Sequence, residues 1–180
     1  GTVLKERRFS QGYFRILPSR KQALELNMAH KTRVLELRSL APPPKVAEKL
    51  LDPEQVILAR RLHYFDDIPV RYEIRYLHGD QCGAILWENL EVDSIHDLLV
   101  TKYNLPLTRV WQRMEAIVLS EEIAFLLDVN PGYPAFHIQR LTYTFDQPVT
   151  WVEYFIRGEI AFEDSFHPQQ TENLDADISY

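Results

Sequence analysis

Charged side chains interrupt two strand-like apolar stretches in the middle of the sequence. Alternation along 55–65 places Arg61 and His63 on one side of the first stretch, and alternation along 70–78 places Glu73 on one side of the second. A charge on an apolar sheet face is costly unless it is paired, and a turn at Pro69 would bring Arg61 and Glu73 within reach of each other. Two interpretations remain open. In the first, Arg61 and Glu73 form a cross-strand ion pair. In the second, Arg61 binds an anionic group of a ligand, and Glu73 accepts hydrogen bonds from hydroxyl or amine groups of that ligand.

Other polar residues pose the same choice between a structural role and ligand contact. His63 and Glu153 both lie inside apolar strand patterns, and each is either structurally satisfied or lines a pocket. No zinc pattern is formed by the remaining histidines, and no nucleophile elbow, phosphate loop or HExxH motif is present. The single cysteine, Cys82, excludes an intramolecular disulfide and a cysteine-based zinc cluster. We therefore expect no catalytic residue, no metal and no cofactor.

One segment of the chain is nearly repeated 79 positions later. "LHYFDDIPVRYEI" spans 62–74 and "LTYTFDQPVTWVE" spans 141–153, and each follows a helix-like stretch, "VAEKLLD" or "IAFLLDV". A helix with one hairpin cannot bury its apolar face alone, whereas two copies can build one antiparallel sheet. The repeat predicts an α+β fold, although chance similarity between two ordinary hairpins is the alternative. The identical pairs are Arg61 and Arg140, Leu62 and Leu141, Tyr64 and Tyr143, Asp67 and Asp146, Pro69 and Pro148, and Val70 and Val149.

Further elements follow from periodicity and from capping residues. Ser19 and Ser120 are plausible N-caps of helices, and Asp93 or Ser94 caps another over 93–103. Alternating or β-rich patterns predict additional strands over 32–40 and 107–119.

Composition narrows the class of protein. The 180 residues are 46% hydrophobic without any run long enough to span a bilayer, so no membrane partner is expected. A single cysteine fits a reducing compartment, so the expected location is the cytoplasm. The net charge of −6 argues against DNA binding by this piece alone, because phosphate neutralisation needs a basic surface. Because the first residue is Gly1 rather than Met, we expect a processed chain whose preceding part is missing.

Several motifs, in order, resemble one known family. "RRLHYFDDIPVRYEIRYL", "SIHDLL" and "SEEIAFLLDVNPGYPAFHIQRLTYTFDQPVTWVEYFIRGE" resemble the UTRA effector-binding domain of GntR-type bacterial transcription regulators of the HutC subfamily. The resemblance covers about residues 30–165 and implies a chorismate-lyase-like fold, an antiparallel sheet with helices packed on one face and the ligand held between them. It also implies a winged-helix DNA-binding domain upstream, and "GTVL" resembles the end of its wing. The implied organisation is a linker over 1–15, the UTRA domain over 16–166 and a tail over 167–180.

The resemblance also implies the site residues and the function. Members sense a small metabolite, form homodimers and reach operator DNA only through the N-terminal domain. The chain departs from the family pattern at His63, where Arg is usual, at His96, where Tyr is usual, and at Ile160 and Ala161. These departures argue against a sugar phosphate as the effector. A smaller acid or an amino-bearing ligand is equally compatible with the sequence. The alternatives are a chorismate-lyase-like enzyme acting on a small aromatic acid, or a dimerisation module without ligand. The implied ligand-binding residues are Arg61, His63, Glu73, Ser94, His96, Glu153 and Arg157, and Arg61, His63, Glu73, Ser94 and Glu153 are expected to converge on one cavity.

Overall fold

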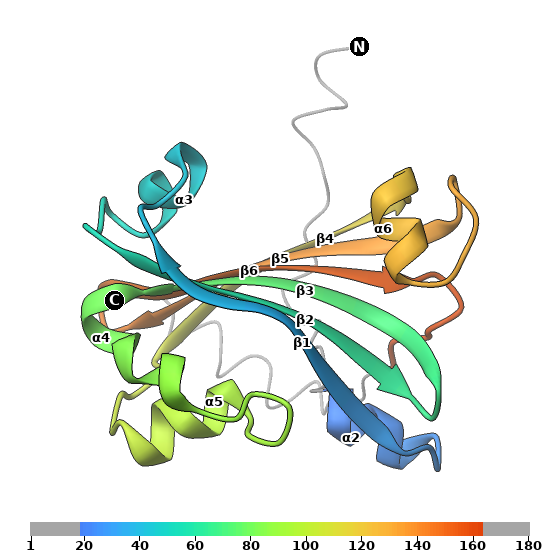
Figure 1. Ribbon diagram of the computed structural model, residues 1–180, viewed down its shortest axis with the longest axis horizontal. Helices are drawn as coiled ribbons and strands as arrows, with labels where there is room; N and C mark the ends of the chain where they lie inside the picture. The colour runs from blue at the N-terminus through green and yellow to red at the C-terminus, as the bar shows by residue number, and fades with distance from the viewer. Residues whose placement is uncertain (1–18, 164–180) are drawn as a thin grey trace, which may run out of the picture. The chain divides into compact units, whose positions relative to one another are not determined.

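A computed structural model describes residues 19–163, and all structural statements below refer to these residues. Their strands form one antiparallel sheet with the order β1-β2-β3-β6-β5-β4 (Figure 1). The predicted linker over 1–15 and tail over 167–180 lie outside the described part of the chain. The strands are β1 (His30–Leu40), β2 (Val56–Phe65), β3 (Ile68–His78), β4 (Arg109–Val118), β5 (Pro134–Thr144) and β6 (Gln147–Arg157).

One short helix precedes the first described strand, and the other helices lie between strands along the chain. Ser120 caps α6 by accepting a hydrogen bond from the Ile123 N–H at 3.4 Å, and α3 has proline in its first turn, where no intrahelical N–H is required. The helix expected over 93–103 is present as α5 continued by the wider turns of η2. The helices are α2 (Ser19–Glu25), α3 (Pro44–Lys49), α4 (Gly79–Cys82), η1 (Gly83–Trp87), α5 (Ile95–Asp97), η2 (Leu98–Lys102) and α6 (Glu121–Leu126).

The internal repeat corresponds to two matching halves of the sheet. The hairpins β2–β3 and β5–β6 meet where β3 pairs with β6, and the ladders of both hairpins shift register at equivalent places, after His63 and after Thr142. The glycines that follow the two hairpins also match. A Cβ on Gly79 would lie 2.5 Å from the Gln55 carbonyl oxygen, and a Cβ on Gly158 would lie 2.5 Å from that of Pro134. The two copies therefore share backbone detail as well as sequence.

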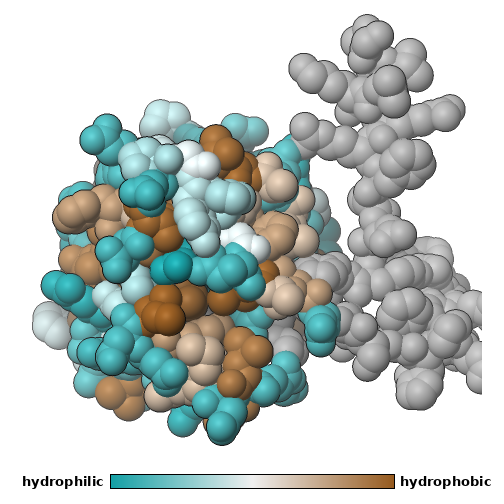
Figure 2. All heavy atoms as spheres, turned by 90° about the vertical axis from the view of Figure 1, so that its right-hand side faces the viewer, coloured by the Kyte–Doolittle hydropathy of each residue, from teal (hydrophilic) through white to brown (hydrophobic). Residues whose placement is uncertain are grey.

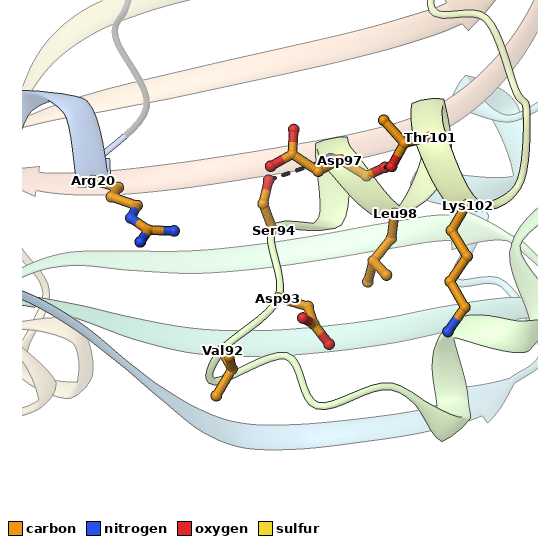
Figure 3. A pocket seen from close by; sticks show the side chains of 8 residues that line it. All are labelled: Arg20, Val92, Asp93, Ser94, Asp97, Leu98, Thr101 and Lys102. Carbon is orange, nitrogen blue, oxygen red and sulfur yellow. Dashed lines mark hydrogen bonds between the residues drawn. The ribbon is translucent and has the colours of Figure 1, made fainter.

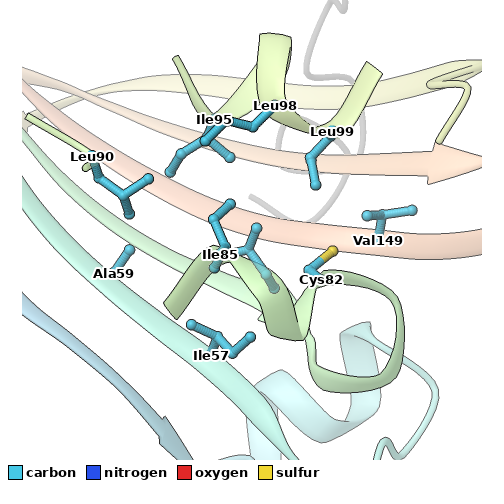
Figure 4. Close-up of a cluster of buried hydrophobic side chains, with 10 residues drawn as sticks. Ile57, Ala59, Cys82, Ile85, Leu90, Ile95, Leu98, Leu99 and Val149 are labelled. Carbon is cyan, nitrogen blue, oxygen red and sulfur yellow. The ribbon is translucent and has the colours of Figure 1, made fainter. Parts of the chain in front are cut away.

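One face of the sheet carries the larger helical layer. The segments α4, η1, α5 and η2 pack against alternate residues of β2, which share a face of the sheet, and against one residue each of β3 and β6 (Figure 4). This layer lies below the sheet in Figure 1, on the same side as α2. The buried cluster comprises Ile57, Ala59, Leu77, Cys82, Ile85, Leu90, Ile95, Leu98, Leu99 and Val149.

The opposite face is covered at two places by α3 and α6, which lie above the sheet in Figure 1. The α3 residues pack on Trp151, which is almost fully buried, and α6 packs on Leu62 and Tyr72. The α+β antiparallel fold is thus as predicted, but the helices lie on both faces rather than on one. The two helices of the repeated unit, α3 and α6, are the ones that occupy this second face.

Candidate ligand-binding site

Arg61 and Glu73 form a bidentate ion pair between β2 and β3. They are direct cross-strand partners, with Arg61 Nε 2.6 Å from Glu73 Oε2 and Nη2 3.0 Å from Oε1. Arg61 Nη1 also donates to the Leu90 carbonyl at 3.2 Å, which ties the pair to the helical layer. Arg61 is 6% exposed and Glu73 is 1% exposed, so the cross-strand ion pair exists and is buried.

Glu73 is shared by several cationic groups. Arg75 Nη2 donates to Glu73 Oε1 at 3.3 Å and also to the Tyr154 hydroxyl at 2.6 Å. Burial alone would raise the pKa of the Glu73 carboxyl, but the charges of Arg61 and Arg75 hold that pKa well below 4.5. The carboxylate is therefore ionised and fully used by protein donors.

His63 extends this network toward β1. Its Nδ1 lies 3.1 Å from His30 Nε2, with the two rings stacked at 5.4 Å between centroids, and its Nε2 lies 3.5 Å from Glu73 Oε1. Burial lowers the pKa of His63 to about 4, the nearby charges of Arg61 and Arg71 act in the same direction, and Glu73 opposes them. His63 is therefore neutral at physiological pH and adds no positive charge.

Arg71 and Tyr154 also belong to this face, although the sequence reasoning did not select them. Arg71 lies opposite His63 on β3 and is 5% exposed, with its guanidinium carbon 5.1 Å from the centroid of the Tyr154 ring. Burial lowers the pKa of Arg71 to about 10, which still leaves it charged at neutral pH. Alternation with Glu73 could have identified Arg71, but Tyr154 is brought close only by the β3–β6 pairing.

Ser94 lies at a separate cavity of about 330 Å³ between α2 and the α5–η2 segment (Figure 3). Its hydroxyl accepts a hydrogen bond from the Asp97 N–H at 3.3 Å, so the predicted helix-capping role of Ser94 is confirmed. His96 is exposed and does not line the cavity. The cavity is lined by Arg20, Val92, Asp93, Ser94, Asp97, Leu98, Thr101 and Lys102.

Glu153 and Arg157 lie on the opposite face of the sheet from Glu73. Tyr154 is the direct partner of Glu73, and side chains alternate between faces, so Glu153 and Arg157 must face the other way. Glu153 Oε1 lies 3.1 Å from His137 Nε2 and 4.0 Å from Lys45 Nζ on α3. Arg157 Nη2 lies 2.6 Å from Glu159 Oε1. The expected convergence of Glu153 with Arg61, His63 and Glu73 on one cavity is therefore wrong.

The described residues offer little for metal or thiol chemistry. Among them no group of three or more His, Cys, Asp or Glu side chains is arranged to hold a metal ion. Cys82 is buried in the cluster of Figure 4, and burial raises the pKa of its thiol to about 12. This thiol is therefore protonated at neutral pH and is not an activated nucleophile.

Comparison with known proteins identifies the fold. The UTRA domain of the protein-family collections matches residues 25–161, which is most of the chain. The chain belongs to the UTRA family. UTRA domains are the C-terminal effector domains of GntR-family, HutC-like transcriptional regulators, and the family is not enzymatic. The alternative of a chorismate-lyase-like enzyme is therefore not retained. Among curated proteins, no significant match is found.

Solved structures of regulators resemble this UTRA domain. The C-terminal domain of the histidine utilization repressor from Pseudomonas syringae is 25% identical with a TM-score of 0.71, covering 77% of this chain and 99% of that one. The effector domain of PhnF from Mycobacterium smegmatis is 16% identical with a TM-score of 0.74, covering 84% and 97%. A GntR-family regulator from Enterococcus faecalis is 21% identical with a TM-score of 0.67, covering 76% and 99%. No described helix of this UTRA domain is long and apolar enough to cross a membrane.

Proposed function

We propose that this UTRA domain binds a small acidic metabolite on the sheet face that carries Arg61 and Glu73. Binding changes the DNA affinity of a winged-helix domain that precedes the domain in the whole regulator. The observation that carries the proposal is the excess of buried and partly buried positive charge on this face. Arg61, Arg71 and Arg75 contribute three cations, Glu73 contributes one anion, and His63 is neutral.

A buried charge without a counter-charge is destabilising, because the low-dielectric interior does not replace the lost hydration. Glu73 satisfies Arg61 and Arg75 but leaves the arrangement with two more cations than anions. An acidic ligand supplies the missing negative charge, and guanidinium groups form paired hydrogen bonds with carboxylates and phosphates. The site thus favours an anionic effector over a neutral one.

The domain also forms a homodimer in this proposal, and the edge strand β4 is the surface that supports it. β4 is at the end of the sheet and exposes the apolar residues Val110, Trp111, Met114 and Val118. Long exposed strand edges promote pairing with another chain. The end of the domain seen in Figure 2 shows a different surface, where apolar side chains form small groups separated by polar ones. The homodimer is tested by light scattering at a protein concentration of tens of micromolar. A monomer at that concentration would contradict the proposal.

The effector site is tested with Arg61→Met. Small molecules that copurify with the protein are identified by mass spectrometry, and their affinity is then measured by calorimetry for wild type and variant. The variant should bind an acidic ligand at least about tenfold more weakly, because a charge-assisted hydrogen bond contributes about 1.5–3 kcal/mol. Arg113→Met is the matched control, since Arg113 pairs with Glu115 at 2.7 Å at the exposed strand β4.

The competing structural interpretation expects the opposite result. If Arg61 only holds Glu73 and Leu90 in place, Arg61→Met lowers the melting temperature while the ligand affinity is unchanged. In the proposal the fold survives, because Glu73 retains its hydrogen bond from Arg75. Measuring both quantities on the same variant separates the two roles.

A further inference from the structure

Within residues 19–163, Arg140 has no acidic partner like the one that its counterpart in the other half has. Arg61 and Arg140 are equivalent in the internal repeat, and the cross-strand partner of Arg61 is Glu73. The cross-strand partner of Arg140 is Val152, which is 0% exposed. The second half therefore keeps the arginine but has a buried valine where the first half has a glutamate. Arg140 Nη2 donates to Gln112 Oε1 at 3.2 Å, and its Nε is buried without a hydrogen-bond partner among the described residues.

Arg71 is a second arginine that has no acidic partner in the described part of the chain. Its Nη2 is buried and has no hydrogen-bond partner within residues 19–163. Its direct cross-strand neighbour is His63, which is neutral, and the carboxylate nearest in sequence, Glu73, is already bound by Arg61 and Arg75. An unpaired guanidinium that is so completely buried costs stability, so its presence calls for a reason other than folding.

The two arginines lie around the same aromatic ring. The guanidinium carbon of Arg71 is 5.1 Å and that of Arg140 is 5.7 Å from the centroid of the Tyr154 ring. Burial is the largest cause that lowers the pKa of Arg71, and the charge of Arg140 lowers it further, so the two cations repel each other. The Tyr154 hydroxyl accepts a hydrogen bond from Arg75, which fixes the ring between the two halves of the sheet.

We propose that Arg71 and Arg140 bind an oxyanion group of the effector, a carboxylate or a phosphate, beside the Tyr154 ring. The inference rests on the proposed function and names the residues and the chemical group that determine ligand selectivity. An oxyanion satisfies the unpaired N–H groups of both arginines and removes the repulsion between them, whereas a neutral ligand does neither. Arg61 and Arg75 are less available for this task, because Glu73 already compensates them.

Sodium phosphate and sodium succinate serve as probes, with sodium chloride at equal ionic strength as the reference. Melting temperature is followed as a function of probe concentration for the whole chain, because a ligand that binds only the folded state raises it by mass action. We expect wild type to respond to at least one of the two probes beyond the chloride reference. A response to phosphate alone assigns a phosphate-bearing effector, and a response to succinate assigns a carboxylate. Wild type that responds to neither overturns the inference.

Arg71→Met and Arg140→Met should each weaken probe binding by about tenfold or more, the effect of losing a charge-assisted hydrogen bond. Without probe, Arg71→Met should melt at or above the wild-type temperature, since it removes an unpaired buried charge. Arg113→Met, at the exposed edge strand, should bind the probe as wild type does. Variants that melt lower but keep wild-type affinity overturn the inference, because both arginines then serve packing only.

Val152→Glu gives an independent test, since it restores in the second half the carboxylate that Glu73 supplies in the first. The new carboxylate would occupy Arg140 and should remove the probe response in a protein that retains its circular-dichroism spectrum. A folded Val152→Glu variant with the full probe response contradicts the inference. Should this variant not fold, the two arginine variants decide. If Arg61→Met loses an acidic ligand that Arg71→Met and Arg140→Met still bind normally, the inference fails while the proposed function stands.

Discussion

The two halves of the sheet share a scaffold but differ in the chemistry of their inner faces. Both have the hairpin, the shifted register near its turn, and a glycine in close contact with the preceding strand. On the face that carries Glu73, the first half is mostly charged, whereas the second half carries one arginine among uncharged residues. Equivalent positions hold Arg61 and Arg140, His63 and Thr142, Arg71 and Thr150, Glu73 and Val152, and Arg75 and Tyr154.

This difference distinguishes positions where the backbone permits only one residue type from positions where the residue type can differ between the two halves. A Cβ at Gly79 or Gly158 would lie too close to a carbonyl oxygen, so any other residue would force both strands to move. No such constraint acts on the inner face, where Glu73 and Val152 occupy the same backbone position with opposite polarity. The first half thereby concentrates charge, and the second supplies an aromatic surface against which that charge lies.

The largest expected effect comes from removing the carboxylate of Glu73 from the charged face of the first half. Glu73→Gln leaves the buried Arg61 and the partly buried Arg75 without a counter-charge, so we expect a loss of about 3–5 kcal/mol in the free energy of unfolding. Urea denaturation followed by circular dichroism measures the change. The native-state pKa of Glu73 is lower than its ordinary value of 4.5, so the stability that its carboxylate contributes is complete above pH 4.5 and is lost as the pH falls below that value. This acid-induced loss of stability should be absent from Glu73→Gln.

Glu115→Gln is the control for this prediction. Glu115 also pairs with an arginine within a strand, but the Arg113 and Glu115 side chains are 46% and 33% exposed. An exposed pair contributes at most about 1 kcal/mol, so the control should change little. If Glu73→Gln and Glu115→Gln lowered the free energy of unfolding equally, burial of the Glu73 carboxylate would have no effect on stability.

A smaller effect is expected when the histidine of the charged half is replaced by the threonine of its counterpart. The pKa of His63 is about 4 in the folded protein and about 6.5 when exposed, so the unfolded chain binds a proton first as the pH falls. Stability contributed by the neutral ring is complete above pH 6.5 and is lost as the pH falls toward 4. From pH 7.5 to 5 this loss amounts to about 2 kcal/mol, and His63→Thr should remove it.

Unfolding free energies measured at several pH values between 7.5 and 5 test this prediction. His30 retains part of the pH dependence in the variant, because burial also lowers its pKa. His96→Thr is the matched control, since it makes the same substitution at an exposed histidine on α5. A His63→Thr variant with the wild-type slope would mean that folding does not lower the pKa of His63.

The fold was largely predictable from sequence, whereas the site was predictable only within one hairpin. Alternation and the spacing around Pro69 were sufficient to bring Arg61 and Glu73 together, because both effects are local. Glu153 was misplaced because its face depends on which residue of β6 lies opposite Glu73, a register set by pairing between distant hairpins. Arg140 is different, because it pairs with Val152 inside one hairpin at the same spacing as Arg61 and Glu73. That Arg140 lies opposite a valine was therefore predictable from the repeat and was overlooked, whereas its closeness to Arg71 depends on the pairing of β3 with β6.

The smallest expected effect concerns the turns of the two hairpins, where the comparison reverses and the second half carries the less suitable residue. Asp66 and Phe145 are equivalent and have φ values of 53° and 51°. A left-handed conformation is tolerated by Asp and Asn but costs a bulky residue more, and the Phe145 ring is 70% exposed, so it gains little from burial.

Phe145→Asn should therefore raise the free energy of unfolding by about 0.5–1 kcal/mol, measured by urea denaturation. The backbone N–H of residue 145 can still donate to the Thr108 hydroxyl, which accepts it at 2.6 Å. Asp66→Asn is the control, because it keeps the side-chain oxygen that accepts from the Ala29 N–H at 2.9 Å and should change stability by less than about 0.5 kcal/mol. Loss of stability in Phe145→Asn would mean that the exposed ring makes a stabilising contact, and the two turns would then not be equivalent in the way the repeat implies.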